Sequence, residues 1–391
     1  MVCPWRTSDR YRLESALPVR RVRPDVTAMG ISPCRFPQVG VRDPARRPPK
    51  AGIPVAPARG EAFDGIRMTA AAALPRLGKE DSMTTINRIV YATDLASTSE
   101  PAWDEARRLG RLFNAEILLL HVLAPPLVFP YEGFIPPELY EELLRNTRHD
   151  AEKGLDRLLG GVAGSGLKVR IRLEEGGPPA ARILEVAAQE AADLLVVGTH
   201  SRTGLQRTIL GSVADRLVRQ ATCPVLTVRP IPERAPRREI RRICYATDFS
   251  PTARAAWPWV VGIASAAGAD VDLVHVTFEP VADSHLPADA IGRMAQLLHE
   301  QGQFEVDRFL ERSPLPRERV HVRLSPGVPA DQIVHQAQEQ AADLIVMGTH
   351  GWSGIVRWML GSVAHHVIQT APCPVLTIAP AGTAHEAHLP A

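Results

Sequence analysis

From residue 87 onward the chain repeats itself with a period of about 150 residues, and this duplication limits the folds open to it. Four blocks return in the same order and at the same spacing: 89–94 as 243–248, 191–200 as 341–350, 210–214 as 360–364, and 223–227 as 373–377. Each period has the length of an ordinary single domain. The chain therefore holds one domain twice in tandem, called copy one and copy two below.

Each copy alternates short apolar runs with longer segments of helical periodicity. The runs are near-continuously apolar, which is typical of strands covered on both faces, and the segments between them carry apolar residues at three- and four-residue spacing. In copy one the predicted strands are 88–91, 116–122, 168–173, 194–198 and 225–228, and the predicted helices are 101–113, 137–159, 178–189 and 212–220. This alternation predicts an α/β fold with a parallel, doubly wound sheet in each copy.

The composition of the first 82 residues differs from that of the repeat. The segment is rich in Pro and Arg and lacks helical or strand periodicity, so we expect it to be disordered. Two interpretations stay open: a basic arm that touches nucleic acid or an acidic surface, or sequence upstream of a natural start at Met83 or Met68. The predicted domains are 83–230 and 240–380, joined by a Pro/Arg-rich linker at 231–239 and followed by a flexible tail at 381–391.

Charge, cysteine content and hydropathy narrow the class of protein. The formal net charge is only +2, so the whole chain carries no nucleic-acid footprint. The five cysteines form no CxxC pair and favour a reducing compartment over a disulfide framework or a zinc site. No apolar run approaches the length of a transmembrane helix. We therefore expect a cytoplasmic protein without a membrane or nucleic-acid partner.

A pattern of glycines after the fourth strand predicts a phosphate site in copy two. Gly348 ends the strand, Gly351 follows three residues later, and Gly361 and Ser362 then open an amphipathic helix. Glycines let the backbone approach a bulky anion, and a helix N-terminus offers free N–H groups and the positive end of its dipole. Taken singly, Gly348 would merely end a strand and Ser362 merely cap a helix. Their combination favours a phosphate cradle.

The same pattern, followed by a helix and Cys-Pro-Val-Leu-Thr, resembles the ATP-binding signature of the universal stress protein family. The opening strand that ends in Thr-Asp and the second strand that ends in His-Val are similar to that family too, and the likeness covers about residues 87–380. It implies a tandem universal stress protein with two Rossmann-like, five-stranded domains of the adenine nucleotide alpha hydrolase type. It also implies ATP, alone or with Mg²⁺, as the ligand. A homodimer through the fifth strands, 225–228 and 375–378, is a further implication.

The resemblance implies roles for single residues. Asp248 would meet the adenosine part of ATP, and the backbone of Val276 would recognise adenine. The phosphates would be surrounded by Gly348, Gly351, Gly361, Ser362 and the N–H of Val363. The matching residues of copy one are Asp94, Val122, Gly198, Gly211, Ser212 and Val213.

Copy one departs from the pattern at one position, where Ser201 replaces the glycine of copy two. If Gly351 adopts a positive φ, a serine there would cost about 1–2 kcal/mol of strain. Its Cβ would also crowd a phosphate. Copy two is therefore expected to be the more competent nucleotide site.

Other conspicuous side chains have structural alternatives. We interpret His121 and His275 as structural, Cys223 and Cys373 as packing residues, and the pair His365-His366 as lacking partners for a metal site. Phosphate contacts remain open for His200, His350, Arg207 and Arg357.

Three functional hypotheses follow. The first is an ATP-binding stress protein that works as a nucleotide-dependent switch on an unknown protein partner, with at most weak ATP hydrolysis, because no committed catalytic base is visible. The second is an enzyme of related topology, a nucleotidyl transferase or a weak ATPase, although strand one is followed by neither of the loops typical of such enzymes. The third is an interaction module that binds no nucleotide.

Overall fold

The computed structural model describes residues 84–123, 137–162, 164–199, 210–230, 239–277, 288–351 and 360–379. The chain divides into two compact units, 1–76 and 77–391, and every described residue belongs to the second. The predictions for the segment 1–82, for nearly all of the linker 231–239 and for the tail 381–391 fall outside the described residues.

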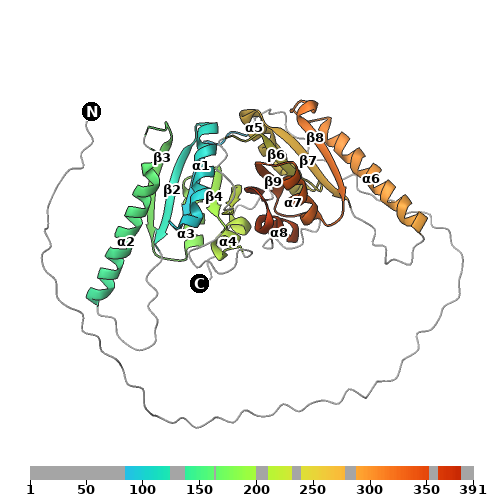
Figure 1. The fold of residues 1–391 in the computed structure, drawn as a ribbon. Helices are drawn as coiled ribbons and strands as arrows, with labels where there is room; N and C mark the ends of the chain where they lie inside the picture. The colour runs from blue at the N-terminus through green and yellow to red at the C-terminus, as the bar shows by residue number, and fades with distance from the viewer. Residues whose placement is uncertain are drawn as a thin grey trace, which may run out of the picture. The chain divides into compact units, whose positions relative to one another are not determined.

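Ten strands of the described part form one sheet (Figure 1). Copy one contributes β1 (Arg88–Thr93), β2 (Glu116–Leu123), β3 (Lys168–Glu175), β4 (Leu194–Gly198) and β5 (Val225–Val228). Copy two contributes β6 (Arg242–Ala246), β7 (Asp270–Thr277), β8 (Val320–Pro326), β9 (Leu344–Gly348) and β10 (Val375–Ile378). Their order across the sheet is β3-β2-β1-β4-β5-β10-β9-β6-β7-β8.

Within each copy all neighbouring strands are parallel. This confirms the predicted fold class, two tandem Rossmann-like domains with five-stranded doubly wound sheets. The strand order reverses between β1 and β4 in copy one and between β6 and β9 in copy two. In sheets of this kind, the crevice beyond the carboxyl ends of the strands at such a reversal is the usual ligand site.

Helices cover both faces of the sheet (Figure 1). They are α1 (Glu100–Phe113), α2 (Pro137–Gly160), α3 (Pro179–Gln189), α4 (Ser212–Gln220), α5 (Pro251–Ala267), α6 (Ala288–Leu310), α7 (Pro329–Glu339) and α8 (Ser362–Thr370), with short 3-10 helices η1 (Ser97–Ser99) and η2 (Arg317–Arg319). One hydrophobic cluster lies under α1, α2, α5 and α6, and the other under α3, α4, α7 and α8. Both clusters contain residues of both copies.

The repeated Ala-Ala-Asp block has a structural role in each copy. The carboxylate of Asp193 accepts hydrogen bonds from the backbone N–H groups of Asn87 and Arg88, at 2.8 and 2.9 Å. Asp343 binds the N–H groups of Arg241 and Arg242 in the same way, at 2.9 and 3.1 Å. The acidic residue ahead of the fourth strand therefore fixes the start of the first strand beside it.

The two five-stranded sheets are joined through their fifth strands. β5 and β10 pair antiparallel, with Leu226 opposite Leu376, and all residues of both strands are buried. The prediction that the copies pair internally through these strands agrees with this arrangement. Each fifth strand has a neighbour on both sides, so a homodimer through the same strands would first have to break the pairing within the chain.

Strand β3 differs from the prediction of a near-continuously apolar strand. It lies at the edge of the sheet, and each of its residues is exposed or half-buried. Its exposed face carries an ion-pair network in which Arg170 and Arg172 both contact Glu190. The guanidinium groups of Arg182 and Arg172 hold the pKa of Glu174 below its ordinary value. Charged edges of this kind oppose pairing with another sheet.

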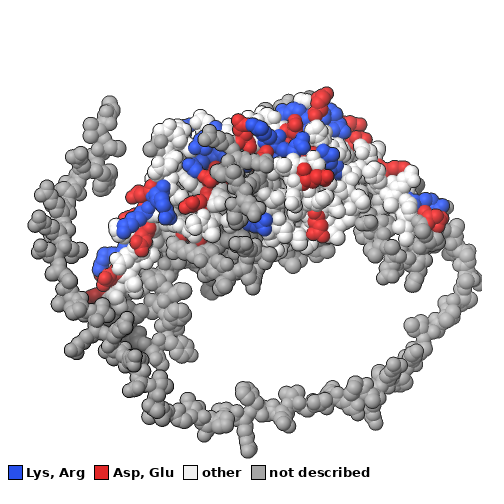
Figure 2. Space-filling view, in the orientation of Figure 1, with Lys and Arg blue, Asp and Glu red and all other residues white. Residues whose placement is uncertain are grey.

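The surface carries charges of both signs, in line with the small net charge of the sequence. Figure 2 shows Lys and Arg side chains interspersed with Asp and Glu over the described residues of one face. Within the described residues, no helix is long and apolar enough to cross a membrane.

Residues ahead of β1 contact the first helix of copy two. A Cβ added at Gly262, in the middle of α5, would lie 2.5 Å from the backbone oxygen of Thr84. Such a distance is far below any ordinary carbon–oxygen contact, so Gly262 is required by the close approach of the two backbones.

Gly262→Ala is expected to lower the free energy of unfolding by about 1–3 kcal/mol, because the new methyl group must displace the backbone at Thr84. Gly292→Ala, in the exposed part of α6, is the matched control. Its Cβ would meet nothing within 4 Å, so it should raise stability by about 0.5–1 kcal/mol through helix propensity. Urea denaturation of the two variants measures both effects. Equal stabilisation by both would contradict the contact between Thr84 and α5.

Burial predicts slow thiol chemistry in both copies. It raises the pKa of the half-buried Cys223 to about 11 and that of the buried Cys244 well above its ordinary value. Since only the thiolate reacts, about one Cys223 in a thousand is reactive at pH 8, and alkylation should accelerate about tenfold per pH unit up to pH 10. Iodoacetamide labelling read by peptide mass spectrometry tests this. Labelling in the folded chain at the rate seen in urea would contradict it.

Candidate functional site

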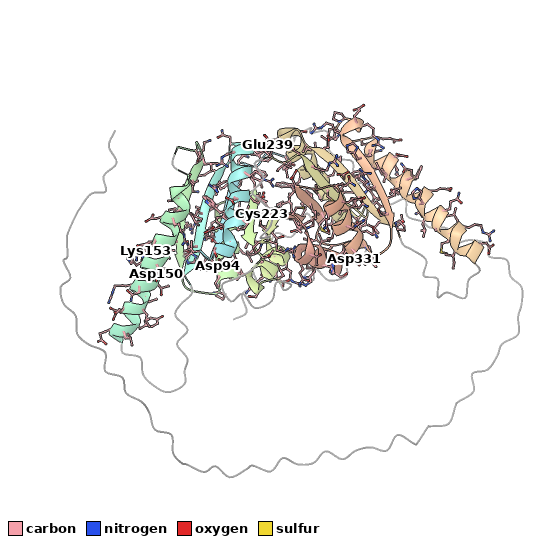
Figure 3. All side chains as sticks on the ribbon, viewed as in Figure 1. Asp94, Asp150, Lys153, Cys223, Glu239 and Asp331 are labelled. Carbon is pink, nitrogen blue, oxygen red and sulfur yellow. The ribbon has the colours of Figure 1, made fainter. Side chains whose placement is uncertain are left out.

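The candidate site of each copy lies at the reversal of strand order. β1 and β4 are neighbours in copy one, and β6 and β9 are neighbours in copy two. All four strands are parallel within their copy, so Asp94 and Gly198 follow or end adjacent strands at the same edge, as do Asp248 and Gly348. Figure 3 labels Asp94 at the end of β1. The structure thus brings together the residues that the sequence placed at these strand ends.

A tight turn holds the aspartate at the tip of β6. The Thr247 hydroxyl accepts a hydrogen bond from the N–H of Phe249 at 3.0 Å, and Asp248 Oδ1 accepts one from the N–H of Ser250 at 2.9 Å. Phe249 has a left-handed backbone, with φ of 58°. Copy one repeats the turn with Thr93, Asp94, Leu95 and Ala96, at 2.9 and 3.1 Å and with φ of 63° at Leu95.

An arginine binds the carbonyl oxygen of the left-handed residue in both copies, but it comes from different helices. In copy two, Arg254 of α5 donates from Nε to the oxygen of Phe249 at 2.8 Å and lies over the Phe249 and Phe309 rings, 5.4 Å from each centroid. In copy one, Arg157 of α2 donates to the oxygen of Leu95 at 3.3 Å. Neither arginine was predicted from the sequence, because both lie on helices outside the glycine-rich pattern.

The two histidines near the ends of the second strands support the tip of the first strand. His121 Nδ1 lies 2.7 Å from the backbone oxygen of Thr93, and His275 Nδ1 lies 2.8 Å from that of Thr247. A carbonyl oxygen only accepts, so each Nδ1 carries the proton. These bonds agree with the structural interpretation. Val122 is buried beside His121 and Val276 is half-buried beside His275, both at the edge that contains the aspartates.

The glycine that ends the fourth strand is needed for packing. A Cβ at Gly348 would lie 3.0 Å from backbone atoms of Thr252 and Ala253, at the start of α5. At Gly198 it would lie 3.3 Å from the hydroxyl of Ser99. In both copies the added Cβ would point toward the start of the first helix of that copy, so the glycine determines how closely this helix approaches the strand end. Its contribution to a phosphate site is indirect.

The helix that follows the glycine-rich segment begins one residue earlier than expected for a serine cap. Gly361 is the N-cap of α8 and Gly211 that of α4, and neither helix has a side-chain cap. Ser362 and Ser212 are the first helical residues, with exposed side chains. A Cβ at Gly361 would lie 2.9 Å from the backbone oxygen of Thr349, so this glycine lets the helix start against the end of the fourth strand.

The reason for Gly351 differs from the prediction. Its φ lies outside the left-handed region, so positive φ does not require the glycine. Instead, an added Cβ would lie 2.5 Å from Asp248 Oδ2. The glycine therefore makes room for the aspartate at the tip of the neighbouring strand. Ser201, its counterpart in copy one, lies outside the described residues.

Copy one holds its aspartate differently. The Ser99 hydroxyl donates to Asp94 Oδ1 at 2.7 Å. The buried hydroxyls of Tyr91 and Tyr245 bond the backbone oxygens of Ser99 and Ala253 at 2.8 and 2.7 Å, which marks these two residues as equivalent. Alanine cannot make the serine bond. The aspartates of the two copies therefore differ in one described neighbour, which is Ser99 in copy one and Ala253 in copy two.

His350 lies two residues beyond the end of β9, and one of its ring nitrogens has no hydrogen-bond partner among the described residues. Its Nδ1 lies 2.9 Å from the hydroxyl of Thr349. Its Nε2 is buried and has no hydrogen-bond partner among the described residues. A buried ring nitrogen without a partner costs free energy unless a ligand or water meets it. The other open candidates, His200, Arg207 and Arg357, lie outside the described residues.

The adjacent histidines of α8 are paired with acids rather than with a metal-ligating set. His366 Nε2 lies 3.3 Å from Asp331 of α7, and His365 Nδ1 lies 3.9 Å from Asp215 of α4. Among the described residues, no group of three or more His, Cys, Asp or Glu side chains is arranged to hold a metal ion.

Comparison with known proteins covers both copies. The model of the universal stress protein family matches residues 85–229 and 239–379. A universal stress protein of Mycolicibacterium smegmatis is 30% identical over 301 residues, which are 75% of this chain and 97% of the relative. The crystal structure of a universal stress protein from Archaeoglobus fulgidus superposes with a TM-score of 0.54 at 20% identity, over 76% of this chain and 97% of that one.

One solved universal stress protein was crystallised in complex with cAMP; it is 28% identical over 36% of this chain and 97% of its own length, with a TM-score of 0.25. The family model alone accounts for more than half of this chain, and it matches twice, once for each five-stranded half of the sheet. The chain belongs to the universal stress protein family, as a member with two family domains in tandem.

Proposed function

We propose that the chain binds ATP at the carboxyl edge of copy two, and that occupancy of this site switches the chain between states with different affinity for a protein partner. The observation that carries the proposal is the start of α8. Gly361 brings the helix N-terminus against the end of β9, at the carboxyl ends of the strands where the strand order reverses. Sites of this kind favour anions, because the first N–H groups of a helix have no partner within it.

The phosphates fit this corner of copy two. The N–H groups of Ser362 and Val363 belong to the first turn of α8, which contains no acidic residue. The buried Nε2 of His350, when it carries the proton, would donate to a phosphate oxygen. Gly361 lets α8 start against the end of β9, Gly351 leaves room for the carboxylate of Asp248, and Gly348 lets α5 approach the strand end. Mg²⁺, where it accompanies ATP, would be held chiefly by phosphate oxygens and water.

The adenosine part would lie over the tips of β6 and β7. Asp248 is fixed through Oδ1 by its own turn, and its Oδ2 faces Gly351. A carboxylate accepts hydrogen bonds only, so it suits the hydroxyl groups of a ribose. The backbone of Val276 at the end of β7 would then meet the adenine edge.

Copy one is the weaker site in this proposal. Asp94 already accepts a bond from Ser99, and the first turn of α4 contains Asp215. A carboxylate in the first turn of a helix competes with a bound anion for the positive end of the dipole. Asp94, Val122, Gly198, Gly211, Ser212 and Val213 would therefore support a site of lower affinity.

ATP titration is expected to find one strong site per chain. Gly351→Ser should weaken this site by roughly five- to thirtyfold, about 1–2 kcal/mol, because the new Cβ displaces the carboxylate of Asp248. Isothermal titration calorimetry measures the stoichiometry and the affinity together. Two equal sites in the natural chain would contradict the preference for copy two.

The duplication supplies the reciprocal experiment. The double variant Ser99→Ala/Ser201→Gly gives copy one the two residues that copy two has beside its aspartate. It should gain a second, weaker ATP site, while Ser99→Ala alone should give a smaller gain in ATP affinity.

Chromatography of the nucleotide after incubation distinguishes an ATP-binding switch from an enzyme, since multiple turnovers of ATP to ADP would favour an enzyme. Absence of binding by every variant would favour an interaction module without nucleotide.

A further inference from the structure

The centre of the joint between the two copies is symmetric. The Thr227 hydroxyl donates to the backbone oxygen of Val375 at 3.2 Å, and the Thr377 hydroxyl donates to that of Val225 at 3.2 Å. Leu226 faces Leu376 between these bonds. Equivalent residues therefore meet across a pseudo-twofold axis, as they would in a dimer of two identical domains.

The helices beside this axis carry an acid and an imidazole at a pair of equivalent positions that face each other. Asp215 in α4 and His365 in α8 each follow the Gly-Ser pair of their copy by three residues. Asp215 Oδ1 and His365 Nδ1 lie 3.9 Å apart across the joint. Both atoms are buried, and neither has a hydrogen-bond partner among the described residues. Two unsatisfied polar atoms of opposite chemistry therefore face each other.

The remaining atoms of the pair are already committed. Asp215 Oδ2 accepts a hydrogen bond from Arg219 Nε at 2.8 Å. His365 Nε2 lies 3.0 Å from Gln369 Nε2. An amide nitrogen only donates, so with this amide orientation His365 Nε2 accepts and the ring proton is carried by Nδ1, which faces Asp215.

A second contact across the joint is also one-sided. Arg229, just after β5, donates to the backbone oxygen of Gln369 at 3.0 Å and reaches that of Thr370 at 3.5 Å. A cation suits these last carbonyl groups of α8, at the negative end of its dipole. The equivalent residue in copy two is Ala379, which has no group to return the contact to α4.

We propose that the Asp215–His365 pair makes the contact between the copies specific for mixed pairing. Copy one then pairs with copy two in preference to another copy one, and copy two pairs with copy one in preference to another copy two. Pairing of two copies one would set Asp215 against Asp215, and pairing of two copies two would set His365 against His365. Only the mixed pairing places an acid opposite an imidazole.

The other charged groups around His365 are few in the described part of the chain. Arg219 on α4 is bonded to Asp215, and Arg229 donates to the end of α8. The other histidine of α8, His366, contacts Asp331 of α7. Asp215 is thus the acid that His365 faces across the joint.

The test is a charge-swap cycle in the full chain, followed by thermal unfolding at pH 6. Asp215→His opposes two imidazoles and His365→Asp opposes two carboxylates, so each should lower the Tm by about 2–4 °C. The double variant Asp215→His/His365→Asp restores the mixed pair and should recover at least half of the summed loss. A double variant whose loss equals the sum of the two single losses would overturn the proposal.

A second measurement covers single variants that fail to fold. Asp215→Asn keeps the size of the side chain and removes its charge, so it should lower the Tm of the natural chain by about 1–3 °C. In the background of His365→Gln, the same substitution should lower the Tm less, because the facing imidazole is gone. Equal losses in the two backgrounds would overturn the proposal. Asp331→Asn, which removes the partner of His366 inside copy two, controls for the neighbouring pair.

Discussion

The antiparallel pairing of β5 and β10 is the constraint on which the rest of the described structure depends. Without it, a strand of four buried residues would form the edge of each sheet and leave backbone groups unpaired. With it, ten strands share one hydrogen-bond network, and both hydrophobic clusters run through both copies. The covalent connection keeps the partner strand at high effective concentration. The free edges of the sheet are then β3 and β8, where polar side chains alternate with apolar ones.

The repeat and the apolar runs were enough to predict the fold, because inner strands of a parallel sheet are buried on both faces and their sequences show it. β3 does not show the near-continuous apolar run of the inner strands, since an edge strand has one exposed face. The strand-end residues Asp94, Asp248, Gly198 and Gly348 were also predictable, because parallel strands deliver their carboxyl ends to one edge. The reason for Gly351 was not, because it lies in a contact with Asp248 about a hundred residues away along the chain. No pattern in one sequence reports that Gly262 approaches the backbone of Thr84.

The two copies have changed their polar contacts in compensating ways. In copy one, Glu190 forms ion pairs with Arg170 and Arg172 of the edge strand β3. The residue equivalent to Glu190 in copy two is the neutral Gln340. Asp272 supplies the missing charge from within β7, where it is 1% exposed and lies 3.3 Å from Arg323 and 3.6 Å from Arg242. Its counterpart in copy one is Leu118. A buried carboxylate is tolerated there because two guanidinium groups offset its desolvation.

Compensation of this kind explains how a duplicated domain can specialise while its fold stays fixed. In a dimer of identical domains, a residue beside the twofold axis meets itself, so a charge there is repelled by its own copy. Duplication within one chain removes this restriction, and Asp215 and His365 use the freedom at one pair of equivalent positions. Both also lie in the first turn of the helix that would receive a phosphate. The acid lowers the attraction of α4 for an anion and the imidazole leaves that of α8 intact, so the exchange that makes the joint specific also separates the two candidate nucleotide sites.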